Sequence, residues 1–466
     1  MSRIVIIGGG PAGYEAALVA AQLDADVTVV EADGAGGACV LSDCVPSKTF
    51  IASSDVVTAF RHGESLGVRV TAPDAVALDA PAVHARVKRL ALAQSADIAA
   101  KLAKAGVELV HGRARLGADT LGHTHRVDVE PVDGAPYALD AGTVLIATGA
   151  VPRILPDCGP DGARILTWRD VYDLPELPER LAIVGSGVTG AEFASAYLAA
   201  GVDVTLVSSR DRVMPHEDPD AAAVIENVFR SRGMTVLSNA RATAVRRTDA
   251  GAVVELADGQ RVDASHVLMA VGSVPNTAGL NLQEYGVDVG PGAYVTVDRV
   301  SRTNVPGIYA AGDCTGLLAL ASVAAMQGRI AMWHALGEAV TPLRLTTVSA
   351  NVFTDPELAT VGVSQDDVDT GRVPGRSITQ PLTGNARAKM ANMQAGFVKL
   401  FCRPASGLVI GGVVVAPKAS ELILPIALAV ENHLSVDQLA KTISIYPSLS
   451  GSLTEAARQL MQHEFE

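Results

Sequence analysis

Residues 4–13 read Ile-Val-Ile-Ile-Gly-Gly-Gly-Pro-Ala-Gly, an apolar strand pattern followed at once by a glycine-rich turn. Helical spacing follows, and Val27–Val30 reads as a second strand that ends at Glu31. A G-x-G-x-x-G turn between a strand and a helix is typical of dinucleotide binding, because the glycines let the backbone approach a pyrophosphate at the helix N-terminus. A terminal acid is placed to accept ribose hydroxyls. This context favours a nucleotide site over a turn without a ligand.

The same pattern returns at Leu181, where a short apolar strand precedes Gly-Ser-Gly-Val-Thr-Gly at residues 185–190. The position that corresponds to Glu31 is Ser208 in this second unit, so the ribose-binding acid is missing. Arg210 and Arg212 follow, and cations without the acid favour a ribose that carries a 2′-phosphate. We therefore expect NADP(H) here, although a missing acid does not exclude NAD(H); the alternative is that both arginines are solvated loop charges.

Composition narrows the class of protein. The chain has 466 residues, 48% of them hydrophobic, which suggests about three domains with large cores. A net charge of −13 argues against nucleic acid as a partner. The five cysteines do not form a secreted disulfide framework, and no signal-peptide or membrane-spanning pattern is found, since the apolar stretch 407–430 is interrupted by proline and charged residues. We expect a cytoplasmic protein without an integral membrane segment, and no metal site.

Residues 36–48 contain Cys39 and Cys44, five positions apart, before a proline and a lysine. A dithiol in so short a segment opens and closes easily, which suits redox chemistry better than a structural staple. The alternative is a pair of ordinary reduced cysteines on a helix. The surrounding nucleotide motifs favour the redox pair.

Two further segments look like ligand-contacting ends of strands. Residues 126–145 resemble a β-meander ending in Thr143–Ile146, and Ala-Thr-Gly at 147–149 follows it with small residues. Residues 308–313 form a strand ending in Asp313, before a helix expected at 319–335. An acid there suits a chain of hydroxyls, although a helix-capping role is the alternative.

The C-terminal part, from about residue 343, has no phosphate loop. Strands are expected at 348–353, 398–401 and 409–415, and helices at 418–433, 435–442 and 450–462. The predicted fold is α/β, with one nucleotide-binding domain at 1–150 and 275–342, a second at 151–274, and a C-terminal α+β domain at 343–466 that suggests an interface or a lid.

On these motifs the chain resembles the flavoprotein disulfide reductases, such as dihydrolipoamide dehydrogenase and glutathione reductase. The resemblance covers nearly the whole length. It rests on the two glycine turns, the C-x4-C-x3-K segment, Ala147-Thr148-Gly149, Ala311-Gly312-Asp313 and Phe353-Thr354-Asp355-Pro356-Glu357. The resemblance implies an FAD-binding domain at 1–150 and 275–342, an NAD(P)-binding domain at 151–274 and a C-terminal dimerisation domain at 343–466.

The resemblance implies a path for electrons. A hydride passes from the nicotinamide to FAD, and the flavin reduces the Cys39–Cys44 bond. Cys44 is then the charge-transfer thiolate against the flavin and Cys39 the exposed interchange thiol. Lys48 lies near the flavin and pairs with Glu192, which flanks the nicotinamide. These four residues and Tyr446 are the expected catalytic residues.

The resemblance also implies the cofactor-binding residues and a homodimer in which each active site is completed by the partner. Asp313 binds the ribityl chain and Ala321 begins a helix aimed at the flavin ring. The expected FAD residues are Gly8, Gly10, Pro11, Ala12, Gly13, Glu31, Gly37, Ala38, Lys48, Ala114, Thr148, Gly149, Gly312, Asp313 and Ala321. The expected NAD(P) residues are Gly185, Ser186, Gly187, Val188, Thr189, Gly190, Ser208, Ser209, Arg210 and Gly272.

The chain departs from the family at one essential place. Disulfide-reducing relatives carry a His-Pro-x-x-x-Glu segment whose His is the general acid/base and whose Glu orients it. Here the His position holds Tyr446 and the Glu position holds Gly451. A phenol with an ordinary pKa near 10 is a poor base near neutrality. His433 and His463 are the candidate replacements, without a supporting motif.

The sequence therefore favours an FAD-dependent NAD(P)H dehydrogenase that passes electrons to a quinone-type acceptor, because flavin electron transfer to a quinone does not need the dyad. The alternative is a thiol–disulfide reductase, either dihydrolipoamide dehydrogenase-like or with another disulfide substrate, which the retained cysteine pair motivates. A flavin redox sensor or binding subunit ranks lower, since sensing does not need a complete second nucleotide site. Mercuric reductase is disfavoured because the chain lacks a C-terminal cysteine pair.

Overall fold

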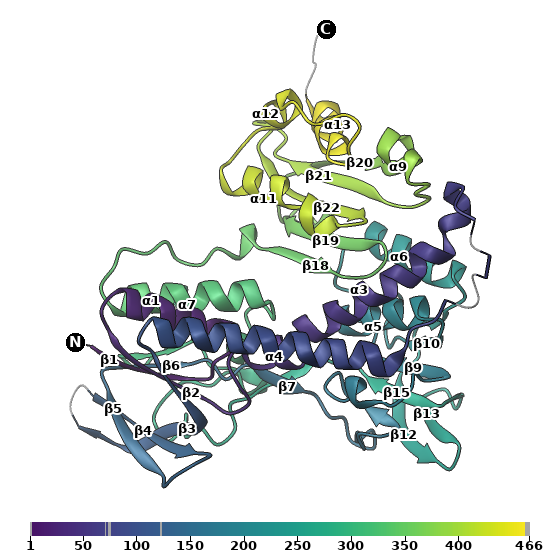
Figure 1. Cartoon of the computed structure of the whole chain (residues 1–466). Helices are drawn as coiled ribbons and strands as arrows, with labels where there is room; N and C mark the ends of the chain where they lie inside the picture. Colours follow the sequence, from purple (N-terminus) through teal and green to yellow (C-terminus); the bar gives the residue numbers. More distant parts are fainter. Residues whose placement is uncertain (1, 70, 73–75, 122–123, 462–466) are drawn as a thin grey trace. The chain divides into compact units, whose positions relative to one another are not determined.

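The computed structural model describes residues 2–69, 71–72, 76–121 and 124–461, with the side chains of 118–121 left out (Figure 1). The chain forms two compact units. The first comprises Met1–Thr49, Ala82–Arg153 and Gly272–Arg344, and the second Phe50–Pro81, Ile154–Val271 and Leu345–Glu466. The predicted boundaries between three domains stay a prediction.

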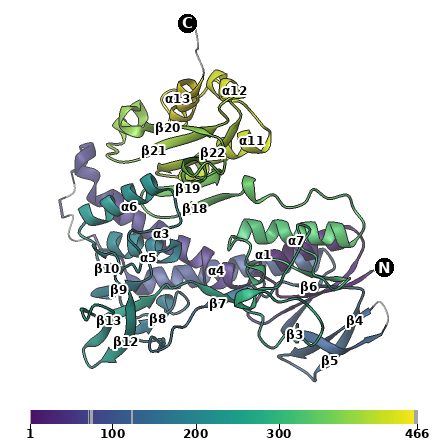
Figure 2. The same cartoon turned by 180° about the vertical axis from the view of Figure 1, so that it is seen from behind.

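The first unit is built on a seven-stranded sheet in the order β17-β6-β1-β2-β3-β4-β5. Figure 2 labels four of these strands, β3 to β6, in a view from behind. The first five strands are parallel, and β3, β4 and β5 form an antiparallel meander. The prediction that Thr143–Ile146 ends that meander is wrong, because this strand pairs in parallel with β1 and β17. The strands are β1 (Arg3–Ile7), β2 (Asp26–Glu31), β3 (Glu108–Leu121), β4 (Thr124–Pro131), β5 (Tyr137–Ala141), β6 (Thr143–Ile146) and β17 (Ile308–Ala310).

Both faces of this sheet are covered, which explains the continuous apolar runs of its central strands. Ile4 and Ile6 face a core shared with helices α1 (Pro11–Gln22), α4 (Ala80–Lys104) and α7 (Ala321–Ala335). Val5 and Ile7 alternate to the opposite face, against the meander. Helices α1 and α7 approach closely at Gly328, where a Cβ atom would lie 2.1 Å from the Ala12 carbonyl oxygen. Small residues therefore set the position of α7. The remaining elements are α2 (Gly37–Leu41), the start of α3 (Cys44–Arg61), β7 (Ala150–Pro152) and β16 (Ser273–Pro275).

The second unit contains a five-stranded parallel sheet in the order β11-β10-β9-β15-β8. Its strands are β8 (Ile165–Leu166), β9 (Arg180–Val184), β10 (Asp203–Val207), β11 (Thr235–Leu237) and β15 (His266–Met269), with helices α5 (Val188–Ala199) and α6 (Pro219–Ser231). A three-stranded antiparallel sheet joins β12 (Ala242–Thr248), β13 (Gly251–Leu256) and β14 (Arg261–Ala264). The strand–turn–helix–strand pattern predicted from residue 181 is confirmed.

The C-terminal part of the second unit is a five-stranded antiparallel sheet in the order β18-β19-β22-β21-β20. Its elements are β18 (Ser349–Val352), β19 (Glu357–Gly362), α8 (Gln365–Asp369), β20 (Arg376–Pro381), α9 (Ala386–Met390), β21 (Phe397–Cys402), β22 (Val409–Ala416), α10 (Ala419–Leu422), α11 (Leu424–Glu431), α12 (Val436–Lys441) and α13 (Gly451–Leu460). The single helix predicted at 418–433 is wrong. Two helices form there, because Pro425 in the first turn of α11 has no N–H to continue α10.

Candidate functional site

The first glycine turn has the geometry that a dinucleotide requires. Gly8 has φ of +106°, which favours glycine, and a Cβ at Gly13 would lie 1.9 Å from the Gly8 carbonyl oxygen. A Cβ at Gly10, in contrast, would meet no atom within 4 Å, so the backbone faces open space. Gly10 is also the N-cap of α1 and supplies no side-chain cap. The first N–H groups of α1 are thus left for an anion in that space.

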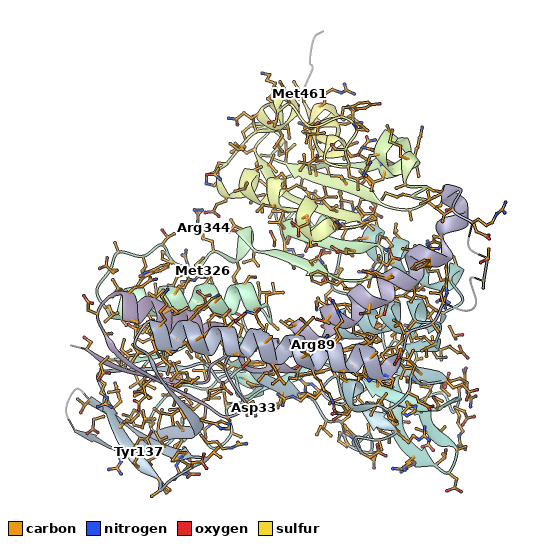
Figure 3. All side chains as sticks on the ribbon, viewed as in Figure 1. Asp33, Arg89, Tyr137, Met326, Arg344 and Met461 are labelled. Atoms are coloured by element: carbon orange, nitrogen blue, oxygen red, sulfur yellow. The ribbon has the colours of Figure 1, made fainter. Side chains whose placement is uncertain are left out.

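Glu31 closes the same site from the end of β2. Its side chain is 8% exposed, and one carboxylate oxygen accepts from the Gly9 N–H. The other oxygen accepts from the Asp33 N–H at 2.7 Å. Asp33 itself is exposed and is labelled in Figure 3. The carboxylate is therefore fixed in place with lone pairs left for ribose hydroxyls.

Small residues open a second side of this site. Gly149 has φ of +66° and no atom within 4 Å of a Cβ position. The Thr148 hydroxyl oxygen is buried and has no hydrogen-bond partner in the described part of the chain. A buried polar atom without a partner calls for one. We read it as an unfilled contact for a ligand at this site.

The strand predicted to end in Asp313 ends three residues earlier, because β17 stops at Ala310 and Asp313 begins a short 3-10 turn. The Gly312 N–H donates to Gln327 Oε1 at 2.9 Å, which ties this turn to α7. Burial, with a contribution from Asp43, raises the pKa of the Asp313 carboxyl to about 6. Ala321 is the first residue of α7, whose N-cap Leu320 supplies no side-chain bond.

The other residues predicted around the first nucleotide site also belong to the first unit. Gly37 has φ of +55°, and a Cβ there would lie 3.0 Å from the Gly10 Cα. Ala38, the next residue of α2, is half-buried. Ala114 is half-buried on β3 opposite Val129. These features together fit FAD. The open space at Gly10 suits a pyrophosphate, the carboxylates of Glu31 and Asp313 suit hydroxyl groups, and the Thr148 hydroxyl still needs a hydrogen-bond partner.

Cys39, in the middle of α2, and Cys44, at the start of α3, are free thiols that are hydrogen-bonded to each other. The Cys44 thiol lowers the pKa of Cys39, and the same bond together with burial raises the pKa of Cys44. Asp43 raises both pKa values and Lys48 lowers both. The roles of the two sulfurs with FAD bound, and the pairing of Lys48 with Glu192, stay predictions.

The second glycine turn repeats the first closely. Gly185 has φ of +109°, a Cβ at Gly190 would lie 1.9 Å from the Gly185 carbonyl oxygen, and a Cβ at Gly187 would meet no atom within 4 Å. Gly187 caps α5 without a side chain, and Val188 and Thr189 form its first turn. The pyrophosphate of a second dinucleotide has the same open approach here. Gly272 lies three residues beyond β15, has φ of +91° and has no atom within 4 Å of a Cβ position.

Ser208 is fully buried, and its hydroxyl lies 2.7 Å from the Ser186 hydroxyl, so it ties the following loop to the glycine turn. Its predicted contact with the nucleotide stays a prediction. Ser209 and Arg210 are exposed, and the Arg210 guanidinium has no hydrogen-bond or ion-pair partner among the described residues. Arg212 is turned inward and donates to the Pro215 carbonyl at 3.2 Å. The structure therefore leaves Ser209 and Arg210 as the candidates for a ribose 2′-phosphate.

Glu192 is buried in α5 and is oriented from the C-terminal sheet. The Phe353 N–H, just beyond β18, donates to Glu192 Oε1 at 2.9 Å. Two residues on, the Asp355 N–H donates to the Ser195 hydroxyl at 3.0 Å, and the Asp355 carboxylate pairs with Arg232 at 2.9 Å. The motif Phe353–Glu357 helped to identify the family, yet nothing in its residue types indicated that its backbone holds Glu192.

Tyr446 is 86% exposed and its neighbours Ile443 and Ile445 are 97% and 79% exposed. Gly451 begins α13. Of the two candidate replacement bases, His433 is exposed after α11, and His463 lies outside the described residues. The described residues contain no group of three or more His, Cys, Asp or Glu side chains placed to hold a metal. Among the same residues, no helix combines the length and hydropathy needed to cross a bilayer.

Comparison with known proteins gives two family matches. Residues 2–328 match the model described as pyridine nucleotide-disulphide oxidoreductase, and residues 348–457 match its dimerisation domain. The chain is 59% identical over 468 residues to a Mycobacterium tuberculosis protein named NAD(P)H dehydrogenase (quinone), with 100% of this chain and 95% of the relative covered. It is 33% identical to the dihydrolipoyl dehydrogenase of Chlorobaculum tepidum, covering 98% and 97% of the two chains. A crystal structure of LpdA from Mycobacterium tuberculosis matches with a TM-score of 0.94 at 59% identity, covering 99% of this chain and 100% of that one.

Proposed function

This chain belongs to the pyridine nucleotide-disulphide oxidoreductase family, whose members use FAD and NAD(P)H, and from that premise we propose that it is an NAD(P)H dehydrogenase that reduces a quinone-type acceptor. The observation that carries the proposal is the loss of the acid/base dyad beside two well-formed nucleotide turns. Tyr446 and Gly451 occupy the dyad positions, while Gly10 and Gly187 keep open approaches for two dinucleotides. The printed name of the relative at 59% identity supports the same acceptor class.

The protein residues have distinct tasks in this proposal. The α1 and α5 N-termini bind the two pyrophosphates, and Glu31 holds the adenosine ribose of FAD. Glu192, fixed by the Phe353 N–H, positions the nicotinamide ring. When bound, FAD supplies the two-electron chemistry that accepts hydride from NAD(P)H and reduces the acceptor. A quinone takes its protons from water, so the step needs no histidine in the protein.

The second candidate function is thiol–disulfide exchange, which the hydrogen-bonded thiols Cys39 and Cys44 favour. The C39S variant separates the two, with S42A as a control in the same segment. For a quinone reductase, NADPH oxidation with a panel of quinones stays within about twofold of wild type in C39S. Loss of nearly all quinone turnover in C39S but not in S42A contradicts the proposal, as does the absence of quinone turnover by flavin-loaded wild type.

We further propose that NADPH is preferred over NADH, through Ser209 and Arg210. The exposed guanidinium of Arg210 suits a phosphate, which it can bind with two parallel hydrogen bonds. R210A is expected to raise the KM for NADPH about tenfold or more and to leave the KM for NADH within about twofold. The control R261A removes an exposed arginine from β14 in the same unit. Equal effects of R210A on both nucleotides contradict the preference.

A further inference from the structure

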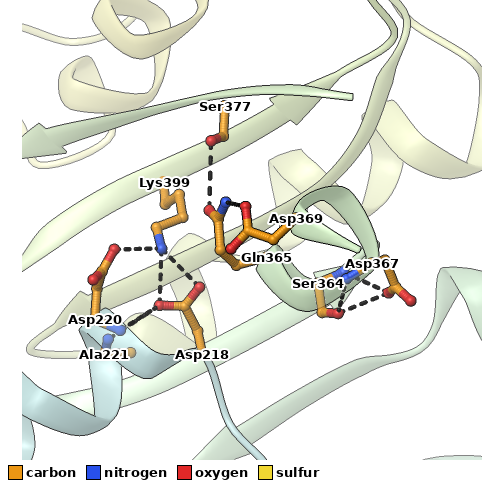
Figure 4. A network of polar contacts seen from close by, with 9 residues as sticks. All are labelled: Asp218, Asp220, Ala221, Ser364, Gln365, Asp367, Asp369, Ser377 and Lys399. Atoms are coloured by element: carbon orange, nitrogen blue, oxygen red, sulfur yellow. Dashed lines mark hydrogen bonds and ion pairs between the residues drawn. The ribbon is translucent and has the colours of Figure 1, made fainter. Parts of the chain in front are cut away.

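Lys399 is a charged residue inside the protein. It lies on β21, and its side chain is 1% exposed. Its ammonium group lies 3.0 and 2.8 Å from the two carboxylate oxygens of Asp218 and 2.7 Å from Asp220 (Figure 4). The Asp218 side chain is 2% exposed, whereas that of Asp220 is 62% exposed. A buried ion pair adds little to stability, because the cost of desolvating the charges offsets their attraction. We therefore ask whether Lys399 serves to fix the position of Asp218.

Asp218 connects this lysine to helix α6. It is the N-cap residue, and its Oδ1 accepts from the N–H groups of Asp220 at 3.0 Å and Ala221 at 3.1 Å. The same carboxylate therefore meets the α6 N-terminus on one side and Lys399 on the other. The position of the first turn of α6 is thus set by a strand of the C-terminal sheet, 181 residues along the chain.

Asp218 is also the last residue of the loop from Ser208 to Asp218, which we call the 208–218 loop. This loop carries Arg210 and begins at Ser208, bonded to Ser186 of the glycine turn. Its middle is tied to the same turn, because the Met214 N–H donates to the Ser186 carbonyl at 2.8 Å. The loop is therefore held by the glycine turn at its start and middle and by Lys399 at its end.

We propose that Lys399 is a positioning residue for the adenosine end of the nicotinamide nucleotide, acting through Asp218 and the 208–218 loop. The inference rests on the proposed placement of that nucleotide beside Arg210. Without Lys399, Asp218 is a buried carboxylate with no cation, and it must move toward water. Burial and Asp218 already raise the pKa of the neighbouring Glu217, so this region has little capacity for more unbalanced negative charge. The loop shifts with Asp218, and the phosphate-binding arginine is displaced.

The test compares K399M, K399R and D220N in the FAD-loaded enzyme. Calorimetric titration with NADP+ gives the affinity without an acceptor, and steady-state kinetics give KM and kcat for NADPH. K399M is expected to weaken NADP+ and raise the KM for NADPH about tenfold, with kcat and the acceptor KM within about twofold. K399R restores most of the affinity. D220N is the matched control and changes affinity less than about twofold, because Asp220 is at the exposed rim and Asp218 keeps its partner.

A K399M protein with full FAD content and unchanged NADP+ affinity overturns the inference, as does an equal loss in D220N. If K399M does not fold, D218N decides, because asparagine caps a helix as well as aspartate but removes the charge that pairs with Lys399. Its NADP+ affinity is expected to fall about tenfold, and an unchanged value overturns the inference. NADP+ binding is measured without an electron acceptor. The affinity of K399M therefore tests this inference even if the wild-type enzyme does not reduce quinones.

Discussion

Two acidic residues of the first unit, Glu31 and Asp313, show how the hydrogen-bond partners and burial of a carboxyl group determine how readily it ionises. Glu31 accepts backbone N–H groups on both oxygens, which compensate its burial. Within the described part of the chain no backbone N–H compensates Asp313 in this way, and burial with the nearby Asp43 raises its pKa to about 6. The Glu31 carboxylate is thus already fixed as a hydrogen-bond acceptor. Ionising the buried Asp313 carboxyl costs free energy, which hydrogen bonds from the proposed ligand would offset.

This difference gives a prediction for D313N. A raised carboxyl pKa means that the folded state loses stability as the pH rises from about 4 to about 6, with the full loss above 6. Replacing Asp313 with neutral asparagine removes the loss, so flavin-free D313N is expected to be more stable than wild type by about 2–3 kcal/mol at pH 8 and by much less near pH 4. Urea unfolding at the two pH values measures the difference.

The same substitution is expected to lower FAD affinity at least tenfold, since the proposed acceptor for the ribityl hydroxyls is lost. D140N, at an exposed position on β5, is the control for loss of one negative charge. Equal stabilisation by both variants, or undiminished FAD content in D313N, contradicts this account.

At the scale of elements, the two glycine turns have nearly the same backbone conformation and packing. In both, the first glycine has positive φ, the last packs against its carbonyl oxygen, and the middle one faces open space. The middle glycine needs no special φ, since Gly187 has φ of −72°. We therefore infer that the missing side chain leaves room for a ligand and is not required by the fold.

We accordingly expect G187A to fold and retain FAD but to bind NADP+ at least tenfold more weakly, because the new methyl group occupies the space for the pyrophosphate. G190A is different, since its Cβ would lie 1.9 Å from the Gly185 carbonyl oxygen and the turn cannot form. The matched control is G159A, which is also open and has no positive φ. Titration with NADP+ and thermal unfolding separate the cases; normal NADP+ affinity in G187A would falsify the assignment.

For the whole molecule, the C-terminal segment that matches a dimerisation domain supports a homodimer. It also carries an unusual concentration of exposed apolar side chains: Ile443 and Ile445 are 97% and 79% exposed, beside Tyr446. Single exposed apolar residues are normal, but several together mark an interaction site. Their place in a dimerisation domain makes a second copy of the chain the expected partner.

The double variant I443E/I445E is therefore expected to dissociate into monomers, because two carboxylates would have to be desolvated in the interface. FAD content should be retained, as the residues proposed to bind the flavin belong to the first unit. Light scattering after gel filtration gives the mass. The control L92E replaces a side chain on α4 that is 64% exposed. A dimeric double variant would show that the segment is not part of the interface.

Much of this protein follows from local sequence patterns. A glycine turn between an apolar strand and a helix determines backbone conformation within a few residues, so both strand–turn–helix–strand segments were predicted near their observed bounds. Strands β19 and β20 were missed, because their residues alternate weakly and become strands only by pairing within the sheet. The helix break at Pro425 was readable from proline chemistry but was obscured by the surrounding apolar residues.

The sequence by itself determined the two glycine turns, Glu31, Asp313, the cysteine pair and the loss of the dyad, because each depends on residue types close together in the chain. Only the tertiary structure decided that Ser208 is buried, that the Phe353 backbone holds Glu192 and that Lys399 pairs with Asp218. These contacts join residues that are distant in sequence. The local spacing of polar and apolar residues does not indicate which of many polar groups will contact one another. Burial, and therefore the strength of each contact, arises only when the chain has folded around it.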